Sequence, residues 1–205
     1  GISGNDFIPN IAGAGTFTIT YTYSDANSCI DSSLQTVTVN PLPIVSFTGL
    51  ATAYCIDATP ATLTGTPSGG TFSGTGITGN AFNPATAGAG TFVITYTYTD
   101  ANTCTNFTTQ TVIVNPLPIV SFVGLAAAYC TSSPAASLTG SPTGGSFSGN
   151  GISGNSFTPI TGGAGTHIVT YTYTDGNTCT NSTTQSVVVN PLPVVSFTGL
   201  ASAYC

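Results

Sequence analysis

Hydrophobic and polar residues alternate along much of the chain with a period of two. In TFVITYTYTD (91–100) aromatic and aliphatic residues alternate with threonine, and TQTVIVN (109–115) continues the pattern with Val112 and Val114. Such alternation predicts β-strands with one face in a core and the other in water. The expected inward side chains of the first string are Phe92, Ile94, Tyr96 and Tyr98.

Shorter runs also resemble strands. They are PIVSFTGL (43–50), ATLTG (61–65), GTFSG (70–74) and GNAFNP (79–84), and clusters of Gly, Pro, Asn and Ser separate them. These clusters are turn signals. No segment shows a helical period, so six or seven short strands with frequent turns predict an all-β fold of the β-sandwich type.

The string YTYTDANTC (96–104) joins the two long strands, and near-copies occupy 21–29 and 171–179. Its acid, amide and cysteine are residue types found in metal and redox sites. They are also typical of a tight reversal, because Asp and Asn hydrogen-bond their own backbone in turns. We favour the hairpin interpretation.

The whole pattern repeats every 75 residues. NPLP begins at 40, 115 and 190, and AYC at 53, 128 and 203. Two prolines two apart stiffen a short connector, so we place the boundaries there. Residues 1–40 are then the C-terminal half of a repeat, 41–115 and 116–190 are complete repeats, and 191–205 begin another. The expectation is tandem immunoglobulin-like β-sandwich repeats of about 75 residues forming an elongated rod.

Composition narrows the function classes. The 205 residues contain no Lys or Arg and six acids, for a net charge of −6. Nucleic-acid binding requires basic residues that neutralise phosphates, and a polybasic membrane patch requires them too. No apolar run approaches the roughly 20 residues of a membrane-spanning helix. The first residues begin in mid-pattern, so we expect a window on a longer chain.

None of the six cysteines falls in a CxxC pair, which argues against a zinc site. Their regular placement in a small, Lys-free, β-rich repeat predicts disulfides made in an oxidising compartment. Three pairings are compatible with the sequence. One lies within each repeat, as Cys55–Cys104 and Cys130–Cys179. A second joins neighbouring repeats, as Cys55–Cys179, and leaves Cys130 for a later one. A third joins sequence neighbours such as Cys29–Cys55, which would also occupy Cys205.

Other candidate sites are weak. Asp25, Asp100 and Asp175 are the acids kept in all three copies, and one carboxylate per repeat is a poor start for Ca²⁺, which takes six to eight oxygens. His167 stands at the repeat position that Phe17 and Phe92 occupy in the other copies, which indicates a packing role rather than catalysis.

The sequence offers no nucleophile–base pair, so we expect no enzyme and no cofactor. Asn106-Phe-Thr108 and Asn181-Ser-Thr183 fit the N-glycosylation sequon.

The strings GTFSGTGITGNAFNPATAGAGTFVITYTYTDANTCTN and VNPLPIVSF resemble the immunoglobulin-like repeats of very large surface adhesins of Bacteroidetes, including the SprB type of gliding flavobacteria. The resemblance covers the whole chain. It implies type IX secretion and display outside the outer membrane.

These observations lead to one main hypothesis and two alternatives. The main one is a structural stalk of an extracellular adhesin or filament, with neighbouring repeats of the same chain as its partners and no membrane insertion in this segment. The alternatives are a repeat module that binds surface glycans, and a filament in which identical chains exchange strands.

Overall fold

The computed structural model describes residues 1–199, so Cys205 and the end of the expected last segment lie outside the described residues. Within these residues the fold is all-β apart from three single helical turns. Contacts divide it into two compact units. The first contains Gly1–Tyr54 and Ala58–Val114, and the second contains Cys55–Asp57 and the residues from Asn115 onward.

The first unit begins with a two-stranded sheet of β1 and β2, a single helical turn α1, and the long β3–β4 hairpin. Their bounds are β1 Ile2–Ser3, β2 Asp6–Phe7, α1 Pro9–Ala12, β3 Gly15–Ser24 and β4 Ile30–Val39. The two long strands pair from Gly15↔Val39 to Ser24↔Ile30.

The rest of the first unit forms three sheets. Their order is β6-β13-β12-β9, β10-β11-β7 and β5-β8. The bounds are β5 Ser46–Thr48, β6 Ala53–Cys55, β7 Ala61–Thr62, β8 Thr64–Thr66, β9 Thr71–Ser73, β10 Ile77–Thr78, β11 Ala81–Phe82, α2 Pro84–Ala87, β12 Gly90–Thr99 and β13 Thr105–Asn115.

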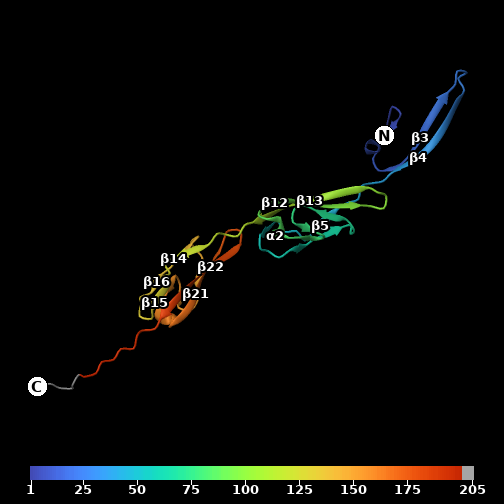
Figure 1. Ribbon diagram of the computed structural model, residues 1–205. Helices are drawn as coiled ribbons and strands as arrows, with labels where there is room; N and C mark the ends of the chain where they lie inside the picture. The colour runs from blue at the N-terminus through green and yellow to red at the C-terminus, as the bar shows by residue number, and fades with distance from the viewer. Residues whose placement is uncertain (200–205) are drawn as a thin grey trace. The chain divides into compact units, whose positions relative to one another are not determined.

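The second unit repeats this arrangement, with sheets β15-β22-β21-β18, β16-β20-β19 and β14-β17 (Figure 1). The bounds are β14 Ser121–Val123, β15 Ala128–Cys130, β16 Ala136–Ser137, β17 Thr139–Ser141, β18 Ser146–Ser148, β19 Ile152–Ser153, β20 Ser156–Phe157, α3 Pro159–Gly162, β21 Gly165–Thr174 and β22 Thr180–Asn190.

The core of the second unit lies between the four-stranded sheet and the shorter sheets. Val169 and Tyr171 of β21 and Val187 and Val189 of β22 form one side, as the alternation of the equivalent strands predicts. The opposing buried side chains are Phe122, Leu138 and Phe157. Two β-layers packed through their inward faces make a β-sandwich, so the predicted fold class is confirmed.

A buried tyrosine joins the two layers of each complete repeat. The ring of Tyr171 lies over Gly140, where an added Cβ would fall 2.1 Å from the ring. Its hydroxyl donates to the carbonyl of Pro142 and accepts from the Gly145 amide at 2.9 Å. Tyr96 makes the same contacts with Pro67 and Gly70. The first and last glycines of GTPSGG and GSPTGG therefore lie directly against this ring, where a side chain would overlap it.

Several predicted strands are shorter in the structure than in the sequence pattern. Within GNAFNP (79–84) only Ala81–Phe82 form a strand, β11, and Gly79, with a φ of 58°, lies in the turn that joins it to β10. PIVSFTGL is a strand only at Ser46–Thr48, and Ile44 is exposed. Single helical turns follow β2, β11 and β20, each begun by a proline whose fixed φ suits the first helical position.

Candidate functional site

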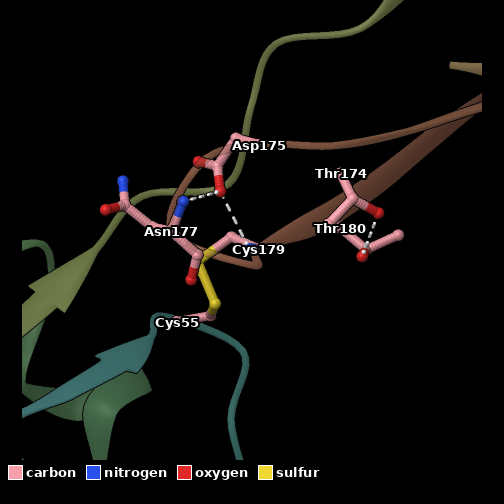
Figure 2. The surroundings of a disulfide bond; sticks show 6 residues. All are labelled: Cys55, Thr174, Asp175, Asn177, Cys179 and Thr180. Carbon is pink, nitrogen blue, oxygen red and sulfur yellow. Dashed lines mark hydrogen bonds between the residues drawn. A yellow bond between two sulfur atoms is a disulfide. The ribbon is translucent and has the colours of Figure 1, made fainter. Parts of the chain in front are cut away.

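The candidate site is the hairpin loop 175–179, which connects β21 to β22 and ends in Cys179 (Figure 2). One carboxylate oxygen of Asp175 accepts hydrogen bonds from the backbone amides of Asn177 and Cys179, both at 2.9 Å. The Asp175 amide in turn donates to the Cys179 carbonyl at 3.0 Å. The carboxylate therefore fixes the backbone that carries the cysteine, as expected for an acid in a tight turn.

The same loop geometry recurs in the other copies. Asp100 accepts from the amides of Asn102 and Cys104 at 2.9 Å, and Asp25 accepts from the equivalent amides at 2.9 and 2.8 Å. The residue before each cysteine has a φ of 66°. The hairpin interpretation accounts for all of these contacts, and the three calcium candidates are engaged with their own turns. Within residues 1–199 no three acidic, His or Cys side chains gather as a metal-binding group.

A pair of threonines closes the hairpin beside the loop. The hydroxyls of Thr174 and Thr180 lie 2.8 Å apart, and those of Thr99 and Thr105 lie at the same distance. Opposed Thr pairs contribute a few tenths of a kcal/mol to a sheet. Together with the aspartate, they hold the cysteine at the start of β22 in one orientation.

Cys179 is fully buried and forms a disulfide with Cys55 (Figure 2). The Cα atoms are 5.5 Å apart, within the range that a disulfide requires. Cys55 lies in the predicted repeat 41–115 and Cys179 in the predicted repeat 116–190, and the two positions are 124 apart in the sequence. Both residues fall in the second compact unit.

The fold explains why a pairing within one repeat does not form. β15 runs parallel to β22 with Cys130 opposite Asn190, at the far end of β22 from Cys179. At about 3.3 Å per residue, the 11 residues of β22 separate the two cysteines by roughly 35 Å. A Cys130–Cys179 bond is therefore geometrically excluded. Cys130 is the last residue of β15.

The remaining described cysteines are free. Cys29 and Cys130 are exposed, and Cys104 is half-buried. Cys55 is committed to Cys179, so the pairing of sequence neighbours that includes Cys29–Cys55 does not occur in this structure. The free cysteines occupy positions equivalent to the bonded ones, either in the hairpin loop or at the end of the AYC strand.

His167 lies on the inward face of β21, near the ring of Phe157 at a centroid distance of 6.4 Å. Phe7 and Phe17 make the equivalent contact at 6.1 Å. The His167 Nε2 atom is 2.9 Å from the Gly163 carbonyl. The His167 side chain is therefore packed against Phe157 and lies within hydrogen-bond distance of a backbone carbonyl.

Sequence reasoning missed one polar anchor. The side-chain amide of Asn181 donates to the Pro118 carbonyl at 2.9 Å, and Asn106 donates to Pro43 in the same way. The bond ties the NPLP connector to the hairpin of the same repeat. The sequence carries a sign of this contact, because in both complete repeats the Asn follows the second proline of NPLP by 63 positions. In the first copy the position is Asp31, whose side chain lacks the amide N–H that Asn106 and Asn181 donate.

Comparisons with known proteins give limited information. No family model and no curated protein matches the chain. Among solved structures, one match is a Ca²⁺-stabilized adhesin that helps an Antarctic bacterium reach out and bind ice, at 15% identity and a TM-score of 0.38. Another is extracellular cadherin domains 1–5 of Protocadherin Gamma B2, at 13% identity and a TM-score of 0.28.

These alignments cover 94% and 90% of the chain but only 60% and 47% of the matched structures. The chain therefore spans a part of each neighbour. Neither similarity is strong enough to carry an argument about function. Across the described residues, no helix has the length and apolar character needed to cross a membrane.

Proposed function

We propose that the chain is a structural segment of an extracellular adhesin or filament, in which consecutive repeats are locked together by disulfides and carry mechanical load. The observation that carries the proposal is the Cys55–Cys179 bond between two sequence repeats. A disulfide within one repeat would stabilise only that repeat, whereas a disulfide between repeats resists their separation under load. Stable disulfides also favour a compartment outside the cytosol.

Three further features support a load-bearing role. Asn181 and Asn106 tie the proline connectors to the hairpins. The long β21–β22 pairing offers ten opposed residue pairs. The Thr-rich, weakly acidic outer faces are suited to a polar extracellular medium. None of these features requires catalysis, and we propose that the segment is not an enzyme.

The finer assignment follows the sequence resemblance. We propose repeats of 41–115 and 116–190 arranged as a rod, in a surface protein of the gliding-motility adhesins of Bacteroidetes, secreted by the type IX pathway and attached to the outer membrane through other regions. The adhesive region would lie elsewhere in the protein. No nucleic acid, membrane lipid or cofactor is needed for this role.

Force spectroscopy on the 205-residue chain tests the proposal. The disulfide bypasses 124 positions, which correspond to roughly 430 Å of extended chain at about 3.5 Å per residue. We expect the oxidised protein to reach a full extension shorter by that amount than the reduced protein. The Cys55→Ser variant should be long under both conditions. Equal lengths for oxidised and reduced wild type would contradict the load-bearing role of the bond.

A binding experiment separates this proposal from a glycan-binding module. Each complete repeat has a hollow beside its buried tyrosine, and that of the first is lined by Gly65, Gly70 and Phe72. A module predicts saturable binding of oligosaccharides to the chain on a glycan array, whereas a stalk predicts none. Saturable binding lost on blocking this hollow would favour the module.

A further inference from the structure

The Cys55–Cys179 disulfide joins the ends of two strands. Cys55 is the last residue of β6, and Cys179 lies directly before β22, which begins at Thr180 (Figure 2). A covalent line therefore runs from β6 through the two sulfur atoms into β22. Residues 56–178 lie outside this line, because the bond connects the positions on either side of them.

β22 is an inner strand of the four-stranded sheet of the second unit. It pairs with β21 over ten residue pairs and with β15 at Ala128–Cys130. Its Val187 and Val189 side chains are fully buried in the core. Tension that enters β22 at Cys179 and leaves it at Asn190 is carried by peptide bonds, since both points lie on the same strand. The neighbouring strands then carry no net load.

A different set of contacts is loaded when the bond is absent. Tension then enters the second unit through the connector before β14 and still leaves it at the end of β22. Asn181 of β22 donates to the Pro118 carbonyl of this connector at 2.9 Å. Gln185 of β22 donates to the Phe122 carbonyl of β14, also at 2.9 Å. Single hydrogen bonds of this kind are individually weak, so the unit should open under load.

We propose that the disulfide is a redox switch that selects the load path through the second unit. In the oxidised protein, tension runs through β6, the two sulfur atoms and β22, and the rest of the unit is shielded from it. In the reduced protein, the same tension pulls the β14 segment away from β22 and unfolds the unit. This inference rests on the load-bearing function proposed above and adds its regulation.

The folded unit protects the bond from reductants. Cys179 is fully buried and Cys55 is half-buried. Thiol–disulfide exchange requires the attacking thiolate to reach a sulfur atom. The Asp175 carboxylate holds the loop around Cys179 through two backbone amides, which keeps this access closed. The shielded state should therefore persist until a reductant is supplied in excess.

Switching requires a reductant, for which a small dithiol such as dithiothreitol suffices. One of its thiolates attacks a sulfur of the bond, which forms a mixed disulfide and releases the other protein sulfur as a thiolate. The second thiolate of the reductant then displaces the remaining protein sulfur and closes a cyclic disulfide. In total the protein disulfide gains two electrons and two protons to become two thiols, and the dithiol loses them.

The test is force spectroscopy at constant force on the 205-residue chain, held by peptide tags fused to both ends. Oxidised and dithiol-reduced chains are compared, and their free thiols are counted by mass spectrometry after alkylation. We expect the reduced chain to show an unfolding step of the second unit that the oxidised chain lacks. Cys55→Ser should show this step without reductant. Cys130→Ser replaces a free cysteine at the equivalent position and should match the wild type in both states.

A paired variant identifies the loaded contacts. Asn181→Ala combined with Gln185→Ala removes both side-chain hydrogen bonds between β22 and the β14 segment. In the reduced chain, we expect the unfolding rate of the second unit at fixed force to rise about tenfold or more. In the oxidised chain, the unfolding kinetics should be unchanged. The matched control is Ser182→Ala combined with Thr184→Ala on the exposed face of the same strand, which should match the wild type in both states.

The outcomes separate this inference from the function on which it rests. The inference is overturned if the oxidised chain shows the second-unit step, or if the paired variant speeds unfolding equally in the oxidised and reduced chains. In either case the load-bearing function stands as long as the two chains differ in full extension. Equal full extensions would overturn the load-bearing function and the inference together.

Discussion

The β3–β4 and β21–β22 hairpins have the same alternating pattern and the same register but different surroundings. Both begin their pairing at a glycine and end it at the residue before the Asp loop. Tyr171 is buried beneath the opposing layer, whereas Tyr21 is 68% exposed. The comparison shows that alternation and loop chemistry specify the hairpin, and that the core forms only where a second layer is supplied.

The largest expected effect is the loss of the buried tyrosine. Tyr171→Ala should lower the free energy of unfolding of its repeat by about 3–5 kcal/mol, because it leaves a cavity and two unpaired backbone groups. Tyr21→Ala should change the stability by less than about 0.5 kcal/mol. Hydrogen exchange of the β22 and β4 amides measures both. Similar costs at the two positions would contradict the difference in burial.

Adding a methyl group at Gly140, which lies against the Tyr171 ring, tests the same packing from the opposing layer. Gly140→Ala should cost about 1–3 kcal/mol, because the new Cβ would overlap the Tyr171 ring and force it to move. Gly176→Ala is the control, since no atom lies within 4 Å of its added Cβ. Denaturant unfolding followed by tyrosine fluorescence compares the two. Equal midpoints would show that the ring yields without strain.

The aspartate loop is where the two hairpins should behave alike. Asp175→Ala and Asp25→Ala each remove an acceptor shared by two backbone amides, for an expected cost of about 1–2 kcal/mol of hairpin stability. The exchange rates of those amides should rise in both variants. An effect confined to Asp175 would mean that the loop depends on its disulfide rather than on local hydrogen bonds.

The smallest effect concerns His167. His167→Phe restores the residue found at positions 17 and 92, and it exchanges the contact with the Gly163 carbonyl for apolar contact with Phe157. We expect a change within about 0.5 kcal/mol, measured as a shift in the thermal midpoint. A large loss of stability would show that the imidazole has a polar role that packing does not explain.

Much of the fold could be predicted because the strands are amphipathic and the repeat shows which positions are equivalent. The inward side of β12 and β21 follows directly from alternation. Four-residue helices are too short to show a period, and the β10–β11 hairpin depends on the positive φ of Gly79. Sequence alone left the disulfide pairing open, because it is decided by the parallel contact of β15 with β22, which puts Cys130 beyond the reach of Cys179.

The hydrogen-bonded carboxylate of Asp175 also affects how the protein ages. Asp175-Gly176 is the one Asp-Gly step in the sequence, and such steps rearrange to isoaspartate when the glycine nitrogen attacks the side-chain carbonyl carbon. Two backbone amides hold one oxygen of this carboxylate, which restricts the rotation that the attack needs. The hydrogen bonds that position Cys179 should therefore also slow isoaspartate formation at Asp175.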